Sequence, residues 1–276
     1  MRLGGPVDAA RDPDVWVAHL RACGYRAAFF PLGPDAADDD VARYARTAAQ
    51  NDIVIAEVGA WSNPLSPDDA ERRAALDKCI AGLAVADRIG ARCCVNIAGS
   101  RGCKWDGPDA RDLTRDTFDL IVETVRKIID AVKPTRSVYA LETMQWMYPD
   151  SVNAYLRLIK AIDRPGFGVH LDPTNLVCSP RIYFRNGAMI RDAIRRLGPR
   201  IRSCHAKDIL LAPDATVHLS EVRPGLGALN YRAYLRGLST LDADMPLMLE
   251  HLPNQDEYGL AADYVRSVAG RLGLGL

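Results

Sequence analysis

Residues 137–142 read Ser-Val-Tyr-Ala-Leu-Glu, and residues 167–172 read Phe-Gly-Val-His-Leu-Asp. Each stretch is a short apolar run that ends in a carboxylate, and a segment with helix-like periodicity follows each run. Short apolar strands that alternate with amphipathic helices are typical of a parallel sheet covered by helices. The two stretches therefore predict consecutive strand–helix units of an α/β fold.

The same pattern extends along the whole chain. One clear helix signal is Ser66-Pro67-Asp68-Asp69, which precedes an apolar stripe that ends at Gly90. Apolar runs, each followed by an amphipathic segment, occupy 2–7, 26–30, 53–58, 92–97, 137–141, 167–171, 201–204 and 246–249. The chain has 276 residues, and α/β barrels commonly use about 250 residues as one domain. Eight units in this length predict a single (β/α)8 TIM barrel over residues 1–276.

An open, doubly wound sheet is the main alternative fold. Such a sheet is expected to carry a glycine-rich phosphate-binding turn after its first strand. The sequence there is Leu3-Gly4-Gly5-Pro6, which does not fit G-x-G-x-x-G, and the chain has no Walker-type run. The closed barrel is therefore favoured, with residues 178–186 and 210–227 as long loops on its catalytic face.

Composition narrows the class of protein. Lys+Arg and Asp+Glu both number 35, so the formal net charge is zero, unlike the basic surface of a nucleic-acid-binding protein. We find no signal-peptide pattern at the start and no apolar run of the roughly 20 residues that a membrane span needs. The seven cysteines show no zinc spacing, which is typical of reduced thiols packed as small apolar groups. We expect a cytoplasmic protein.

Four late strands end in polar side chains that can bind a metal. Glu142, Asp172, His205 and Glu250 close the runs at 137–141, 167–171, 201–204 and 246–249, respectively. In a parallel barrel the carboxyl ends of all strands meet at the face that carries the active site. The alternative is that each is an unrelated polar residue capping a loop. Because all four stand on consecutive units, we expect them to converge.

Three clustered carboxylates repel one another unless a cation lies among them. Oxygen-rich ligation with one nitrogen suits hard divalent cations, and the absence of a thiolate from the set argues against a structural zinc. We therefore predict one divalent metal ion held by Glu142, Asp172, His205 and Glu250. Mn²⁺ is the first candidate, with Mg²⁺ and Co²⁺ as alternatives.

This ligand pattern resembles the xylose isomerase-like TIM barrel superfamily, and in particular its sugar (phosphate) isomerase/epimerase branch. Nearly the whole chain takes part in the resemblance. Shorter phrases are similar as well: Ile55-Ala56-Glu57-Val58-Gly59-Ala60-Trp61, His205-Ala206-Lys207-Asp208, and Pro224-Gly225-Leu226-Gly227. The resemblance implies a TIM barrel with one metal ion that acts on a carbohydrate. The branch includes isomerases, epimerases, dehydratases and lyases.

The resemblance also implies roles for the two glutamates. In ketose epimerases of this kind, one metal-bound glutamate removes the proton next to the sugar carbonyl, and the other returns a proton to the opposite face. Those roles fall on Glu142 and Glu250, acting through a metal-stabilised enediolate. Ketose epimerases tend to carry a histidine three residues after the aspartate, where this chain has Asn175. This difference argues against ketose 3-epimerisation itself.

Further candidates lie beside the four ligands. His170 stands two residues before Asp172 and so on the same side of its strand, where it is a candidate base or a buried structural histidine. Candidates for substrate binding are Glu57, Trp61, Asn175 and Lys207, and the alternative role of Lys207 is an ion pair with a carboxylate. Aromatic residues in the predicted rim loops, suited to a bulky aglycone, are Trp105, Trp146, Tyr148, Tyr183 and Phe184.

Several functions remain open from sequence. The first hypothesis is a metal-dependent sugar isomerase or epimerase, alone or as a homo-oligomer. The second is a lyase that cleaves 3-oxo-glycosides by β-elimination at the same site, in the manner of carbon-glycoside deglycosidases, with a small β-rich partner subunit. A DNA-repair endonuclease of the superfamily needs more histidines than the five present. A non-catalytic sugar- or metal-binding barrel is the fourth. No nucleic-acid or membrane partner is expected.

Overall fold

The computed structural model describes residues 1–8, 12–33 and 36–276. Within these ranges, eight parallel strands close into a barrel in the order β1-β10-β7-β6-β5-β4-β3-β2. The barrel strands are β1 (Arg2–Gly4), β2 (Ala27–Phe29), β3 (Val54–Gly59), β4 (Cys93–Asn96), β5 (Tyr139–Glu142), β6 (Phe167–Leu171), β7 (Ile201–Ala206) and β10 (Pro246–Leu249). The prediction of a (β/α)8 barrel is confirmed, and each strand overlaps its predicted run.

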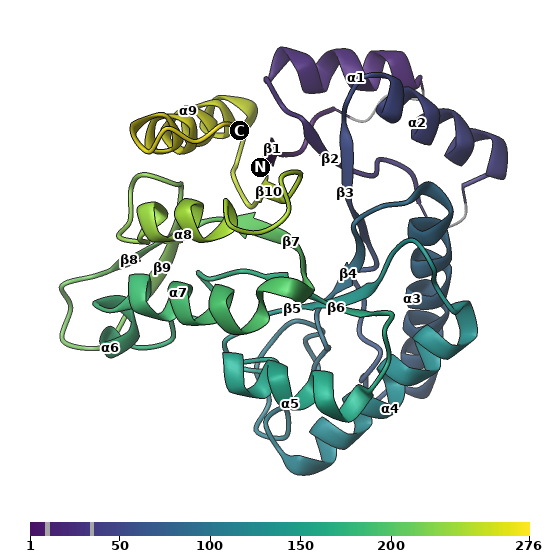
Figure 1. Ribbon diagram of the computed structural model, residues 1–276. Helices are drawn as coiled ribbons and strands as arrows, with labels where there is room; N and C mark the ends of the chain where they lie inside the picture. Colours follow the sequence, from purple (N-terminus) through teal and green to yellow (C-terminus); the bar gives the residue numbers. More distant parts are fainter. Residues whose placement is uncertain (9–11, 34–35) are drawn as a thin grey trace.

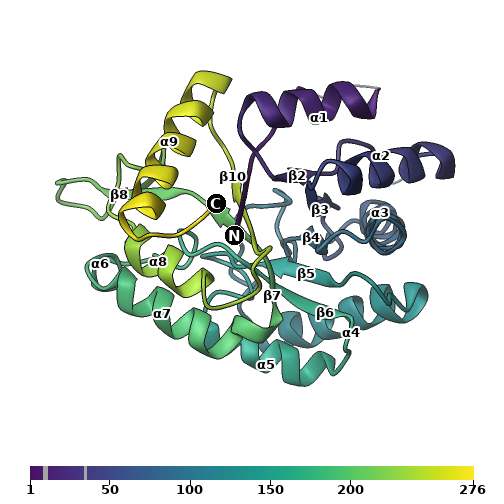
Figure 2. The same ribbon diagram turned by 45° about the horizontal axis from the view of Figure 1, so that its top comes forward.

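Helices surround the barrel on the outside, and the two chain ends lie side by side (Figures 1 and 2). The buried faces of the helices pack against the strands, and their polar residues face outward, as the amphipathic segments predict. The helices are α1 (Pro13–Ala22), α2 (Asp38–Gln50), α3 (Asp69–Ile89), α4 (Arg115–Val132), α5 (Val152–Ile162), α6 (Pro180–Tyr183), α7 (Asn186–Leu197), the 3₁₀ turn η1 (Gly198–Arg200), α8 (Tyr231–Leu238) and α9 (Gln255–Arg271).

Local sequence signals fix where the helices begin and end. The Asp68 side chain accepts hydrogen bonds from the amides of Ala70 and Glu71 at the start of α3, which satisfies two amides that the helix cannot pair itself. Gly90 ends α3 in the left-handed conformation with φ of 72°, where a side chain would be strained. The segment Ser66–Gly90 therefore forms the helix that its sequence predicts.

Two tyrosines from the helical layer tie adjacent strands together just below the rim formed by the carboxyl ends of the strands. The Tyr155 hydroxyl lies 2.6 Å from the carbonyl oxygen of Leu141 on β5 and 3.0 Å from that of Gly168 on β6. The Tyr234 hydroxyl lies 3.0 Å from the carbonyl oxygen of His205 on β7. Both rings are fully buried. These contacts fix the relative height of the strands that end in the predicted metal ligands.

The two predicted long loops contain regular structure. Residues 178–186 include the short helix α6, and residues 210–227 include most of an antiparallel hairpin, β8 (Asp208–Leu211) with β9 (Leu219–Val222). The hairpin follows β7 directly and stands outside the barrel sheet. Asp208 holds its base, since its buried carboxylate accepts hydrogen bonds from the amides of Gly225, Gly227 and Leu229. A Cβ atom at Gly227 would lie 2.4 Å from the Asp208 carboxylate, so only glycine fits there.

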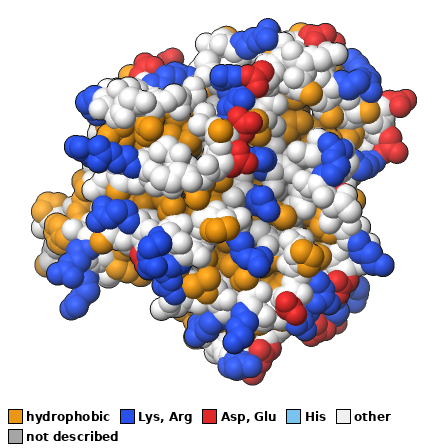
Figure 3. Space-filling model, viewed as in Figure 1, with side chains coloured by type: hydrophobic (Ala, Val, Ile, Leu, Met, Phe, Trp, Pro, Cys, Tyr) orange, Lys and Arg blue, Asp and Glu red, His pale blue; other side chains and the backbone are white. Residues whose placement is uncertain are grey.

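The surface is mixed in charge. On the face shown in Figure 3, Lys and Arg side chains are distributed widely, with smaller groups of Asp and Glu between them, in agreement with a formal net charge of zero. Among the helices of the described residues, none is long and apolar enough to cross a membrane.

We expect Asp208→Asn to destabilise the protein by about 1–3 kcal/mol, because the amide brings two donors to a pocket of backbone N–H groups and leaves buried donors unpaired. Urea denaturation followed by circular dichroism measures this change. Asp214→Asn, at the exposed hairpin tip, is the matched control and should change the free energy of unfolding by less than about 0.5 kcal/mol. Equal stability of the two variants would contradict the role given to Asp208.

Candidate metal and substrate site

The four predicted metal ligands converge at the carboxyl ends of β5, β6, β7 and β10. One ligand atom from each of Glu142, Asp172, His205 and Glu250 lies within 4.8 Å of all the others. The His205 Nδ1 atom is 3.1 Å from Glu142 Oε1 and 2.9 Å from Glu250 Oε2. Glu142 and Glu250 stand on strands separated in the barrel by β6 and β7, so they reach the cluster from two sides. The convergence predicted from the strand ends is therefore observed.

Asp172 is held in place by Thr143, which follows β5, and by the amides of its own loop. The backbone N–H of Asp172 donates to Thr143 Oγ1 over 3.0 Å, and the Thr143 hydroxyl donates to the Asp172 carbonyl oxygen over 2.7 Å. Its Oδ1 atom accepts a hydrogen bond from the Thr174 amide over 2.8 Å. The other carboxylate oxygen, Oδ2, is left for the cluster. The end of β6 therefore presents one carboxylate oxygen in a defined direction.

Lys207 brings a buried positive charge into the cluster. Its Nζ atom lies 2.7 Å from Glu250 Oε2, 3.0 Å from Asp172 Oδ2 and 3.6 Å from Glu142 Oε1, and its side chain is 2% exposed. Although burial alone would lower the pKa of Lys207, the carboxylates of Asp172, Glu142 and Glu250 hold it well above the ordinary value. The ammonium group is therefore charged and partly balances the carboxylates.

The carboxylates differ in their readiness to ionise. Burial raises the pKa of Asp172 to about 6, and Glu142 adds to this effect against the opposing charge of Lys207. Burial also disfavours ionisation of Glu142 and Glu250, but His205 and Lys207 hold the pKa of both below its ordinary value. Both glutamates are therefore ionised near neutral pH and able to accept a proton.

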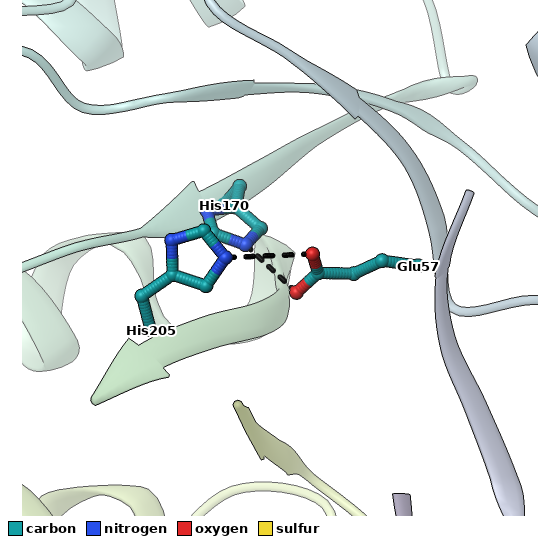
Figure 4. Close-up of side chains that lie close together, drawn as sticks. All are labelled: Glu57, His170 and His205. Carbon is teal, nitrogen blue, oxygen red and sulfur yellow. Dashed lines mark hydrogen bonds and ion pairs between the residues drawn. The ribbon is translucent and has the colours of Figure 1, made fainter. Parts of the chain in front are cut away.

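A second cluster lies within the barrel beside the first. Figure 4 shows the carboxylate of Glu57, from β3, facing the adjacent imidazoles of His170 and His205. His170 Nε2 is 2.9 Å from Glu57 Oε1, and His205 Nε2 is 3.5 Å from Glu57 Oε2. The two imidazoles contact each other with ring centroids 4.2 Å apart. Burial would raise the pKa of Glu57, but the two histidines hold it far below its ordinary value. His205 thus belongs to both clusters, one at each ring nitrogen.

A cavity of about 480 Å³ opens over the metal-ligand cluster. Among the described residues, three of the predicted substrate-binding side chains line it, namely Trp61, Asn175 and Lys207. Asn175 donates a hydrogen bond to Glu142 Oε1 over 3.1 Å. Glu57 and His170 are 1% and 0% exposed, and neither is among the described residues that line the cavity. Both therefore lie too deep to contact a substrate in this conformation.

Only part of the predicted aromatic rim faces the cavity. Trp105 and Trp146 line it together with Trp61, Ile97 and Met144. The Tyr148 hydroxyl instead donates to the carbonyl oxygen of Leu113, and Tyr183 and Phe184 belong to the region of α6. For the described part of the chain, these last three are outside the cavity lining. The apolar wall therefore comes from the loops after β3, β4 and β5.

The sequence analysis did not identify Glu221 as a site residue, but the structure places it in the cavity wall. Its Oε1 atom is 3.1 Å from His251 Nδ1, and its Oε2 atom is 3.8 Å from Lys207 Nζ. It stands on β9, inside a segment that we predicted to be a loop. The alternation of apolar and polar residues in Val217-His218-Leu219-Ser220 is the signal that could have located the strand.

The donor set fits a hard divalent cation. In the described residues, Asp172 Oδ2 and Glu250 Oε2 are buried and accept no hydrogen bond of good geometry. Both oxygens face the ammonium group of Lys207, whose single charge does not balance three carboxylates, and a divalent cation would offset the remaining negative charge. Three carboxylates, one imidazole and no thiolate form the ligand combination that Mn²⁺ and Mg²⁺ accept. We therefore infer that Glu142, Asp172, His205 and Glu250 can hold such an ion.

The chain is similar in fold to several solved structures, some of which are sugar epimerases. L-Ribulose 3-epimerase aligns with 17% identity and a TM-score of 0.72 over 99% of this chain and 94% of that one. The E. coli 3-keto-D-glucoside 4-epimerase aligns with 10% identity and a TM-score of 0.70 over 98% and 99%. A Mycobacterium smegmatis protein in complex with magnesium aligns with 18% identity and a TM-score of 0.67 over 96% and 90%.

Identities this low show a common fold and leave the reaction open. A comparison with curated protein sequences finds no match to this chain. The model of one protein family does match, over residues 17–268, and its description is xylose isomerase-like TIM barrel. This match covers nearly all of the strand–helix units, including the four that carry the converging side chains. The chain belongs to the xylose isomerase-like TIM barrel family.

Proposed function

We propose that the protein is a divalent-metal-dependent sugar isomerase or epimerase. The observation that carries this proposal is the cluster of Glu142, Asp172, His205 and Glu250 beneath a cavity large enough for a monosaccharide. A divalent cation held there polarises a sugar carbonyl and makes the neighbouring C–H bond more acidic. The sugar epimerases among the similar structures support this class of reaction. Mn²⁺ is our first choice of metal, with Mg²⁺ and Co²⁺ as alternatives.

The side chains of this chain supply the proton transfers. Glu142 and Glu250 are held ionised by His205 and Lys207, so either carboxylate can remove the proton next to the carbonyl. Because the two glutamates approach from different strands, the second, once it has taken a proton from water, can donate that proton to the other side of the same carbon. Lys207 and Asn175, which line the cavity, hold substrate oxygens through N–H donors. Asp172 contributes only as a ligand.

The apolar wall favours a second candidate function. Trp61, Trp105 and Trp146 line the cavity and pack against one apolar cluster, which gives an aromatic surface of the kind that binds a ring or an aglycone. A lyase that cleaves 3-oxo-glycosides by β-elimination starts with the same proton abstraction. In that reaction the second glutamate, after it takes a proton from water, donates that proton to the leaving group. A small β-rich partner subunit belongs to this candidate, and a homo-oligomer is compatible with either.

Incubation of the Mn²⁺-loaded protein in D₂O with a panel of ketoses and 3-oxo-glycosides tests the proposal. We expect deuterium at a carbinol carbon of recovered substrate or product, detected by NMR, and loss of exchange after chelation with recovery on adding Mn²⁺. Release of an aglycone without exchange into a free sugar would place the lyase first. Neither exchange nor cleavage on any member of the panel would favour a binding barrel without turnover.

We expect Glu142→Gln and Glu250→Gln to lower kcat by about 10²–10⁴-fold, because the amide keeps an oxygen ligand but cannot accept a proton. Steady-state kinetics gives kcat, and calorimetric titration with Mn²⁺ gives metal affinity for the same samples. Glu123→Gln, on the exposed face of α4, is the matched control and should match the wild type. Equal losses of metal affinity and of kcat would mark both glutamates as ligands alone.

The aromatic wall makes a separate prediction. Trp105→Ala and Trp146→Ala should raise KM for a glycoside with an aromatic aglycone by about tenfold, since each removes a stacking surface worth roughly 1 kcal/mol or more. KM for a free ketose on the same variants is the internal control and should change less than threefold. A uniform rise in KM for both substrate types would show that the wall binds the sugar itself.

A further inference from the structure

Glu57 was predicted to bind substrate, yet the structure buries it beside the histidine of the metal-ligand cluster. Its Oε1 atom accepts a hydrogen bond from the Ser203 hydroxyl and faces His170 Nε2 at 2.9 Å. Its Oε2 atom faces His205 Nε2 at 3.5 Å (Figure 4). Within the described chain, these last two atoms are buried and neither makes a hydrogen bond of good geometry. The contact between them is an ion-pair contact, in which each faces the other.

The chemistry of imidazole fixes which nitrogen carries the proton. A neutral imidazole carries one N–H and one lone pair, and a metal ion takes the lone pair of the ring nitrogen that faces it, which leaves the proton on the other nitrogen, here Nε2 toward Glu57. The neutral ring then has its lone pair at Nδ1. Nδ1 is the nitrogen that faces the metal-ligand carboxylates, at 3.1 Å from Glu142 and 2.9 Å from Glu250. The two ring nitrogens of His205 thus have different roles: Nδ1 binds the metal ion and Nε2 donates its N–H toward Glu57.

We propose that Glu57 is a positioning residue that holds His205 in the Nε2–H tautomer and directs its Nδ1 atom to the metal ion. This inference rests on the proposed metal site and adds to it a carboxylate on β3, on the far side of the barrel from the four ligands. A carboxylate that accepts the second N–H of a metal-binding histidine fixes the ring and strengthens the ligand, and its loss typically weakens metal binding 10- to 100-fold.

The structure also supplies a matched control within the same cluster. Ser203 and His170 both contact Oε1 of Glu57, whereas His205 faces Oε2. Ser203→Ala therefore disturbs the buried carboxylate on the side away from the metal ligand. Glu57→Gln keeps the size of the side chain but removes the negative charge that His205 faces. The two substitutions separate a general disturbance of the core from the specific contact with His205.

The test is calorimetric titration of Mn²⁺ into chelator-treated wild type, Glu57→Gln and Ser203→Ala, with the melting temperature of each metal-free protein as a measure of folding. We expect one Mn²⁺ per chain, a Kd at least tenfold higher for Glu57→Gln, and a Kd within about twofold of wild type for Ser203→Ala. Equal Kd values for wild type and Glu57→Gln would overturn the inference alone. An equal loss in Ser203→Ala would overturn it as well.

Two further results would contradict the inference. Binding of two Mn²⁺ ions per chain would show that Glu57, His170 and His205 form a metal site themselves, and absence of binding by the wild type would refute the metal site and this inference together.

A measurement on the wild type covers the case in which Glu57→Gln does not fold. In the Mg²⁺-loaded, ¹⁵N-histidine-labelled protein, with His205→Asn to assign the signal, NMR should find the His205 proton on Nε2; a proton on Nδ1 would overturn the proposal.

Discussion

The site depends on the closure of parallel strands into a barrel. Because all eight strands run the same way, the residues that end them meet at one rim, although the four converging side chains are 30 or more residues apart in sequence. Small errors in strand height would separate these side chains. The tyrosines of α5 and α8, each in contact with main-chain carbonyl groups of neighbouring strands, prevent such errors. Fold and site are therefore secured by the same buried contacts.

A balance of charge determines how that rim is built. Glu142 and Asp172 are buried in a largely apolar barrel and Glu250 is partly buried, in surroundings where unpaired carboxylates are costly. Lys207 and His205 supply positive charge or N–H groups from β7 and its end, and the proposed divalent cation would supply the rest. Below these groups in the barrel, the carboxylate of Glu57 faces the other ring nitrogen of His205. The site is thus a chain of alternating acidic and basic groups that leads from the cavity into the barrel.

The sequence predicted the barrel and the four converging side chains because both depend on local signals: apolar runs of strand length, each with a polar residue at its carboxyl end. The depth of a side chain within the barrel was harder to predict. Glu57 and His170 point into the barrel, as predicted, but lie too far below its rim to line the cavity. Alternation along a strand predicts which face a side chain lies on but not its distance from the rim. Glu221 was missed because its strand pairs with β8 and not with the barrel. Tyr183 and Phe184 were misplaced because loop direction follows from long-range packing.

The hairpin β8–β9 has a consequence for how a barrel of this family can diverge. It follows β7, pairs only with itself and is fixed at its base by Asp208, while residues 214–218 at its tip are exposed. Changes of length or sequence at that tip do not disturb the barrel strands. Yet β9 carries Glu221 into the cavity wall. The hairpin is therefore a part of the cavity wall whose tip can change in evolution while the strands that carry the four converging side chains stay the same.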